Sequence, residues 1–146
     1  MTPQETLISK YGNPYESKVE FEQKWMSLYA CQSEFPSLPF KRIYCHKHLI
    51  PEIRKVFKAL LEKDLLKEIV TFDGCFMPRY IRGYEAKKIL SIHTWALALD
   101  FNAAENPLGG PVKFSQAFLQ VWRDCGWRCG SDFKRLDGMH FERPDL

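Results

Sequence analysis

The chain has 146 residues, of which 45% are hydrophobic, 14% aromatic and 27% charged. This length suits one globular domain, and the abundance of aromatic residues excludes an intrinsically disordered chain. The formal net charge of +3 comes from dispersed Lys and Arg residues, and no nucleic-acid recognition motif accompanies it. We therefore expect a single domain over residues 1–146 that binds no nucleic acid.

No segment of the sequence is typical of membrane insertion or export. The first ten residues are polar, and no apolar run is long enough to cross a bilayer. The five cysteines are an odd number without paired spacing, which favours free thiols over a disulfide framework. Cys45 and Cys75 are interpreted as packing residues, and Cys125 with Cys129 would be half of a zinc site that no second cysteine pair completes.

The N-terminal part is predicted to begin with a short helix. Thr2 and Glu5 have the spacing of a capping box, and Gly12 is expected to end the helix near Tyr11. Residues 1–40 are interpreted as a helical and loop extension packed on the domain. Within it, three side chains are expected to pack in the core: Phe21, Trp25 and Leu28.

The middle of the chain carries the clearest helical pattern. Arg42–His46 is a plausible short strand, and Pro51–Glu68 is predicted to be a helix. Ile69–Phe72 is predicted to be a strand that leads into Asp73 and Gly74. The apolar residues at helical spacing are Ile53, Val56, Phe57, Leu60 and Leu61.

The last third of the chain alternates strands with one helix. Trp95–Phe101 is predicted to be a strand, and Ser115 is expected to cap a helix that ends at Gly126. Trp127–Glu142 fits two short strands around an Asp137-Gly138 turn. Together these elements predict an α+β fold, in which helices flank a small, mostly antiparallel sheet.

Two of the four histidines stand in settings that suit a metal. A catalytic zinc ion typically takes three His or carboxylate ligands and leaves a fourth position open, and His93, Asp100 and His140 would supply such a set. In a regular strand, residues seven apart point to opposite faces. His93 must therefore precede the strand, or a bulge must intervene.

The segment Ser91–Asp100 resembles the S-x-H-x-x-G-x-A-x-D signature of zinc D-alanyl-D-alanine carboxypeptidases and dipeptidases. Phage L-alanyl-D-glutamate endopeptidases share this signature, and the group is related to the Hedgehog-type zinc peptidase fold. Ala96 stands where the family usually has glycine. A second motif, Asp137-x-x-His140 followed by Phe-Glu, resembles the family's other metal segment.

Further likeness to the small phage members lies upstream, in Asp73–Phe76, Arg79 and residues 81–83. The resemblance covers roughly residues 40–142. It implies that zinc is bound by His93, Asp100 and His140 and that Asp137 is the catalytic base. On this basis we infer that Arg79 binds a substrate carboxylate or stabilises the oxyanion, and Arg82 is the alternative residue for this role. We also infer that Ser91 orients the site through hydrogen bonds.

Three functions stay open at this point. We prefer an endopeptidase of phage lysin type that cleaves between L-Ala and D-Glu of the peptidoglycan stem peptide, and the close alternative is a D-Ala-D-Ala carboxypeptidase or dipeptidase. A zinc-binding virion or interaction module without turnover is the third. His46 and His48 could bind metal from one strand face, but no third ligand is evident.

The resemblance to lysins also sets expectations about state and location. We expect a monomer made in the cytoplasm of a phage-infected bacterium. It would act on the cell wall after release or as part of the virion.

Overall fold

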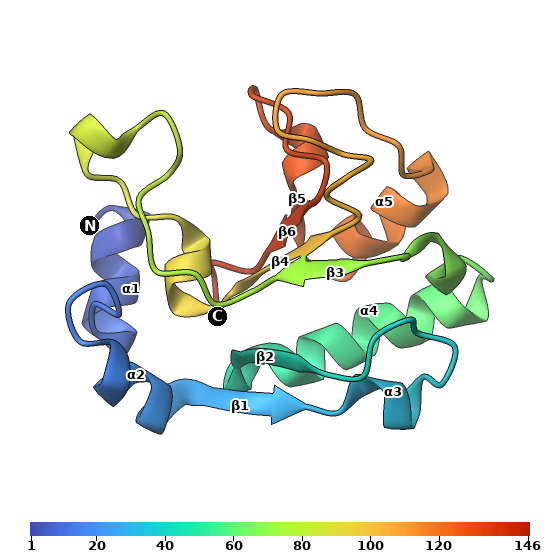
Figure 1. Ribbon diagram of the computed structural model, residues 1–146, viewed down its shortest axis with the longest axis horizontal. Helices are drawn as coiled ribbons and strands as arrows, with labels where there is room; N and C mark the ends of the chain where they lie inside the picture. The colour runs from blue at the N-terminus through green and yellow to red at the C-terminus, as the bar shows by residue number, and fades with distance from the viewer.

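Six strands form two antiparallel sheets in the computed structural model, which describes residues 1–146 (Figure 1). The larger sheet has the order β3-β4-β6-β5, made of β3 (Phe72–Gly74), β4 (Ala98–Phe101), β5 (Arg128–Cys129) and β6 (His140–Glu142). A separate pair joins β1 (Met26–Tyr29) to β2 (Ile43–His46). The predicted α+β class is confirmed, with two small sheets in place of one.

Alternation along β4 and β6 gives the larger sheet two chemically different faces. Leu99, Phe101 and Phe141 are fully buried and point to one face, where the ring of Phe141 stacks on Trp122 at 4.2 Å. Asp100 and His140 are directly paired across the two strands and point to the other face. The hydrophobic core and the polar site therefore lie on opposite faces of one sheet.

Helices α4 (Ile50–Glu62) and α5 (Gln116–Asp124) cover the apolar face. Ser115 caps α5 as predicted, and Gly126, with φ +91°, follows its end. The predicted helix Pro51–Glu68 is too long, because α4 stops at Glu62 and only a 3-10 turn covers Leu66–Glu68.

The early end of α4 has a specific cause. Asp64 adopts φ +58°, its N–H donates to the carbonyl of Leu61, and the N–H of Leu65 donates to the carbonyl of Leu60. These two bonds form a Schellman motif, which usually places glycine where Asp64 stands. The sequence pattern misses this stop because the residue is not glycine.

Three further predictions need correction. The strand predicted for Ile69–Phe72 begins only at Phe72, and the strand predicted for Trp95–Phe101 begins only at Ala98. Residues Ile92–Trp95 instead form a 3-10 turn, η4. Leu28, expected in the core, is 55% exposed, because it points outward from the two-stranded sheet.

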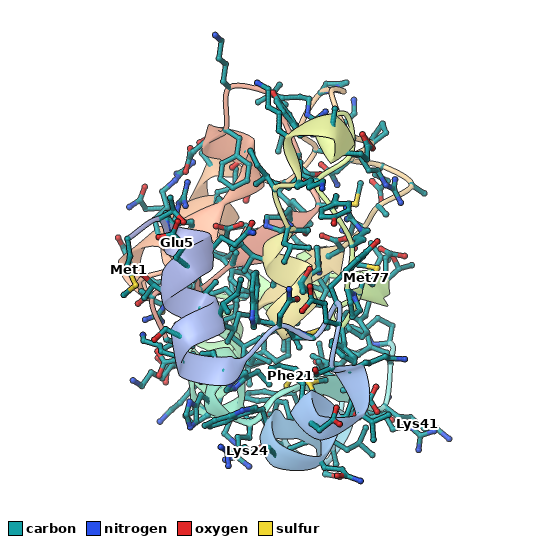
Figure 2. The ribbon with its side chains drawn as sticks, turned by 90° about the vertical axis from the view of Figure 1, so that its left-hand side faces the viewer. Met1, Glu5, Phe21, Lys24, Lys41 and Met77 are labelled. Atoms are coloured by element: carbon teal, nitrogen blue, oxygen red, sulfur yellow. The ribbon has the colours of Figure 1, made fainter.

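The N-terminal segment packs along one side of the domain (Figure 2). Helix α1 (Pro3–Tyr11) has the predicted capping box and ends before Gly12, and α2 (Lys18–Trp25) follows. The indole N–H of Trp95 donates to the carbonyl of Gly12 at 2.9 Å. One turn of helix, α3 (Cys31–Glu34), precedes β2. No helix in the chain has the length and apolar character needed to cross a membrane.

Candidate metal centre

His93 reaches the polar face of the sheet from just before β4. It lies in η4, where the side chain of Ser91 caps the turn by accepting a hydrogen bond from the His93 N–H at 3.3 Å. Ala96 then adopts a left-handed conformation, φ +55°, and redirects the chain into β4. His93 therefore precedes the strand that carries Asp100, as the odd spacing between these two residues requires if both are to face one metal. Glycine, which the resembling signature has at the position of Ala96, adopts this conformation without strain.

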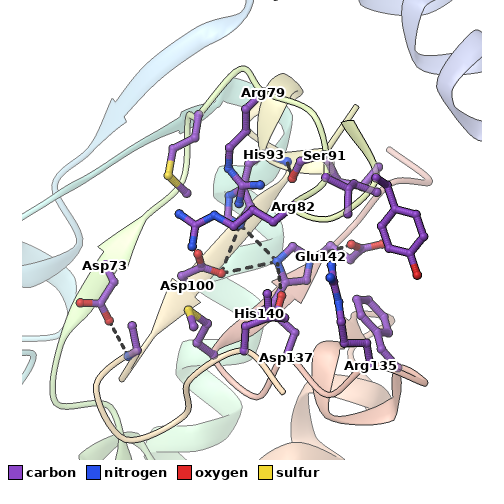
Figure 3. A pocket seen from close by; sticks show the side chains of 18 residues that line it. Asp73, Arg79, Arg82, Ser91, His93, Asp100, Arg135, Asp137, His140 and Glu142 are labelled. Carbon is purple, nitrogen blue, oxygen red and sulfur yellow. Dashed lines mark hydrogen bonds and ion pairs between the residues drawn. The ribbon is translucent and has the colours of Figure 1, made fainter. Parts of the chain in front are cut away.

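Three ligand atoms converge on one point between these elements (Figure 3). His93 Nε2 lies 3.1 Å from Asp100 Oδ1 and 3.1 Å from His140 Nδ1, and His140 Nδ1 lies 3.4 Å from Asp100 Oδ1. For a tetrahedral zinc ion with bonds of about 2.0–2.1 Å, two ligand atoms are separated by roughly 3.3 Å. The triangle therefore has the size of one face of a zinc coordination tetrahedron.

Hydrogen bonds on the far side of each ring set which nitrogen is free. His93 Nδ1 lies 2.8 Å from the carbonyl oxygen of Cys75, which can only accept, so Nδ1 carries the proton. His140 Nε2 lies 2.6 Å from Glu142 Oε1 and is likewise the donor. When the rings are neutral, each turns a lone pair toward Asp100, an arrangement that a divalent cation stabilises. Without a cation, a proton on His140 Nδ1 takes that place.

The electrostatics around His140 agree with a cation-binding point. Burial lowers the pKa of His140, but its hydrogen bonds to Asp100 and Glu142 outweigh this effect and raise the pKa to about 9. Burial also raises the pKa of Asp100, yet the two histidines hold it well below its usual range. The carboxylate is thus kept ionised in a buried place, where positive charge is favoured.

Glu142 is a site residue to which sequence analysis gave no role. It is buried, and its second oxygen, Oε2, accepts from Arg128 Nη1 at 3.2 Å. A signal was present, since residues two apart on a strand share a face and His140 lies two before Glu142. Carboxylates that hold the free N–H of a ligating histidine are a common feature of zinc sites.

Asp137 lies beside the ligands without joining them. Its Oδ2 is 3.9 Å from His140 Nδ1, and it occupies the turn before β6. Burial raises the pKa of Asp137, and the charge of Asp100 raises it further, against the lowering effects of His140, His93 and Arg135. A carboxylate with a raised pKa is suited to accept and return a proton near neutral pH.

Arg79 lines the same cavity from the segment before η4. Its backbone N–H donates to Thr94 Oγ1 at 3.2 Å, and its carbonyl accepts from the Ser91 N–H at 2.9 Å. Its side-chain Nε is buried without a hydrogen-bond partner. Burial lowers the pKa of Arg79, and the nearby charge of Arg82 lowers it further, whereas the charges of Asp100 and Asp137 act in the opposite direction.

A cavity of about 450 Å³ joins these groups (Figure 3). Its lining includes every residue predicted for the site, together with Glu142 and further side chains from three loops. The predicted site residues are Arg79, Arg82, Ser91, His93, Asp100, Asp137 and His140.

The competing metal sites find no support in the structure. His46 Nδ1 accepts from the backbone N–H of His48, and the two rings lie against Tyr11 and Trp25, with no carboxylate or cysteine completing a ligand set. The cysteines are free, and Cys45 and Cys75 are buried packing residues as predicted.

Comparison with known proteins points to the same residues. Residues 85–143 match the family described as D-alanyl-D-alanine carboxypeptidase. This segment is less than half of the chain, and it contains His93, Asp100, Asp137 and His140 but not Arg79. No curated protein and no solved structure matches the chain. At the family level, the match supports a zinc peptidase that acts on peptidoglycan peptides.

Proposed function

We propose that the chain is a zinc-dependent peptidase that hydrolyses the stem peptides of peptidoglycan, with His93, Asp100 and His140 as the zinc ligands. The observation that carries this proposal is the triangle of candidate ligand atoms, with edges of 3.1, 3.1 and 3.4 Å. Each histidine ring is oriented by a hydrogen bond from its other nitrogen, to the carbonyl of Cys75 for His93 and to Glu142 for His140. Zinc held there would supply Lewis-acid chemistry, activating water and polarising a peptide carbonyl.

The residues around the triangle have complementary tasks. Asp137 would accept the proton of the attacking water and return it to the leaving amine. Arg79, which lines the cavity and forms no ion pair, would hold a carboxylate of the peptide through its guanidinium group. Glu142 would orient His140 through its hydrogen bond to Nε2. Ser91 would hold the turn that carries His93.

Among peptidoglycan bonds, we favour the L-Ala–D-Glu bond. Support comes from the likeness of Asp73–Phe76 and Arg79 to the small phage endopeptidases. The alternative, removal of a terminal D-Ala, is favoured by the description of the matching family. Action on the cell wall after release from the producing cell, or from a virion, follows from the endopeptidase reading.

The test combines metal content with product analysis. Purified protein should bind about one zinc per chain, and His93→Ala and His140→Ala should each lose most of it. Asp137→Asn should keep zinc while cleavage of purified peptidoglycan falls by about a hundredfold or more.

Mass spectrometry then identifies the bond. New N-terminal D-Glu supports the endopeptidase, whereas loss of terminal D-Ala alone supports the carboxypeptidase. A zinc-loaded protein that releases neither product would refute the peptidase proposal and leave a zinc-binding module without turnover.

A further inference from the structure

The arginines of this chain divide into two groups according to their partners. Four of them form ion pairs with carboxylates: Arg54, Arg123, Arg128 and Arg143. Of the other four, three line the cavity and pair with no carboxylate: Arg79, Arg82 and Arg135. The cavity also carries carboxylates, but none of them lies within ion-pair distance of these three guanidinium groups, so each group can still bind an anionic part of a ligand.

Arg135 is the member of this group that comes from the loop before Asp137. Its guanidinium lies 5.2 Å from the ring centroid of Tyr84, a cation–π contact with another residue that lines the cavity. Its Nη1 also lies close to Gly83, where even a Cβ atom would approach it to 3.0 Å. The contact holds the guanidinium at the cavity wall and leaves its N–H groups without a protein acceptor.

Arg135 and Arg79 occupy different parts of the cavity. In the view of Figure 3, Arg79 lies at the top of the site, above Asp100 and His140, whereas Arg135 lies at the lower right, beyond His140 and Asp137. A single carboxylate held by Arg79 would not also satisfy Arg135.

We propose that Arg135, held against Tyr84, is a specificity-determining residue that binds a second carboxylate of the substrate, separate from the carboxylate held by Arg79. This inference rests on the proposed function and narrows its substrate class to peptides with two carboxylates near the scissile bond. Guanidinium binds carboxylate through two parallel hydrogen bonds, and lysine cannot reproduce that geometry.

The test uses two synthetic stem peptides and the zinc-loaded protein. One peptide has both carboxylates free, and in the other the carboxylate farther from the scissile bond is a carboxamide. Arg135→Gln should raise KM for the first peptide about tenfold, with kcat changed less than about threefold, and should leave KM for the carboxamide unchanged. Tyr84→Leu should produce a smaller rise in KM for the first peptide only. Arg42→Gln, at an exposed arginine without an ion pair outside the cavity, is the matched control and should change neither.

A binding measurement separates this inference from the proposed function. Calorimetry measures the Kd of each peptide for two zinc-loaded proteins, the Asp137→Asn variant and the double variant that also carries Arg135→Gln. If the wild type cleaves both peptides and Arg135→Gln affects them equally, the second carboxylate site is refuted and the peptidase stands. If no peptide is cleaved but the two-carboxylate peptide binds more tightly through Arg135, the peptidase is refuted and the site stands. If the peptides neither bind nor are cleaved, both proposals fail.

Discussion

Replacing Glu142 with glutamine tests whether the carboxylate that is hydrogen-bonded to His140 Nε2 contributes to the affinity for zinc. Glu142 accepts from two donors, His140 Nε2 at 2.6 Å and Arg128 Nη1 at 3.2 Å. Glutamine keeps the shape but has only one oxygen, so one donor must face an amide N–H₂ group. With Glu142 and His140 both buried, an unsatisfied donor there costs about 1–3 kcal/mol.

We therefore expect Glu142→Gln to weaken zinc binding by about ten- to a hundredfold, in line with the effect of similar carboxylates in other zinc sites. Competition with a chromophoric chelator measures the zinc Kd, and circular dichroism checks the fold. Arg128→Gln is the control: it removes the more exposed partner but leaves the carboxylate on His140, so its Kd should stay within about threefold of wild type. A Glu142→Gln protein whose zinc Kd is within twofold of wild type would refute the role of Glu142.

Three further predictions follow from the backbone and from burial. Asp64→Gly should raise the free energy of unfolding by about 1 kcal/mol in denaturant titration, because glycine adopts the left-handed conformation without strain; an unchanged or lower value would contradict this. Gly130→Ala should lower cleavage at least about tenfold while zinc stays bound, since its Cβ would overlap the carbonyl oxygen of Asp137 and displace the proposed base; cleavage at the wild-type rate would refute this effect. Burial lowers the pKa of His46 to about 3 from its usual 6.5, so the unfolded chain binds more protons between these values. Stability of the zinc-free protein should therefore fall as pH drops below about 6.5, by up to about 1.4 kcal/mol per pH unit. His46→Asn, which keeps an acceptor for the His48 N–H, should reduce that slope, and an equal slope in both proteins would refute the assignment.

The sequence alone determined those features that depend on local chemistry. The capping box at Thr2, the cap at Ser115 and the amphipathic pattern of α4 each involve residues within a few positions of one another. The grouping of His93, Asp100 and His140 could also be predicted, because these residues lie in two motifs that resemble those of a known family, and the structure brings them together. The end of α4 was missed where Asp64 takes the place of the usual glycine.

Only the tertiary structure decided how distant groups meet. The carbonyl of Cys75 fixes the proton of His93 from 18 residues away, and Tyr84 contacts Arg135, which is 51 positions later in the chain. No local pattern encodes these contacts, because they depend on the antiparallel pairing of β3 and β6 with β4 and on the loops that this sheet brings together. Residue types and short-range spacing specify which groups can bind a metal. The packing of the sheet specifies which nitrogen of each histidine turns toward it.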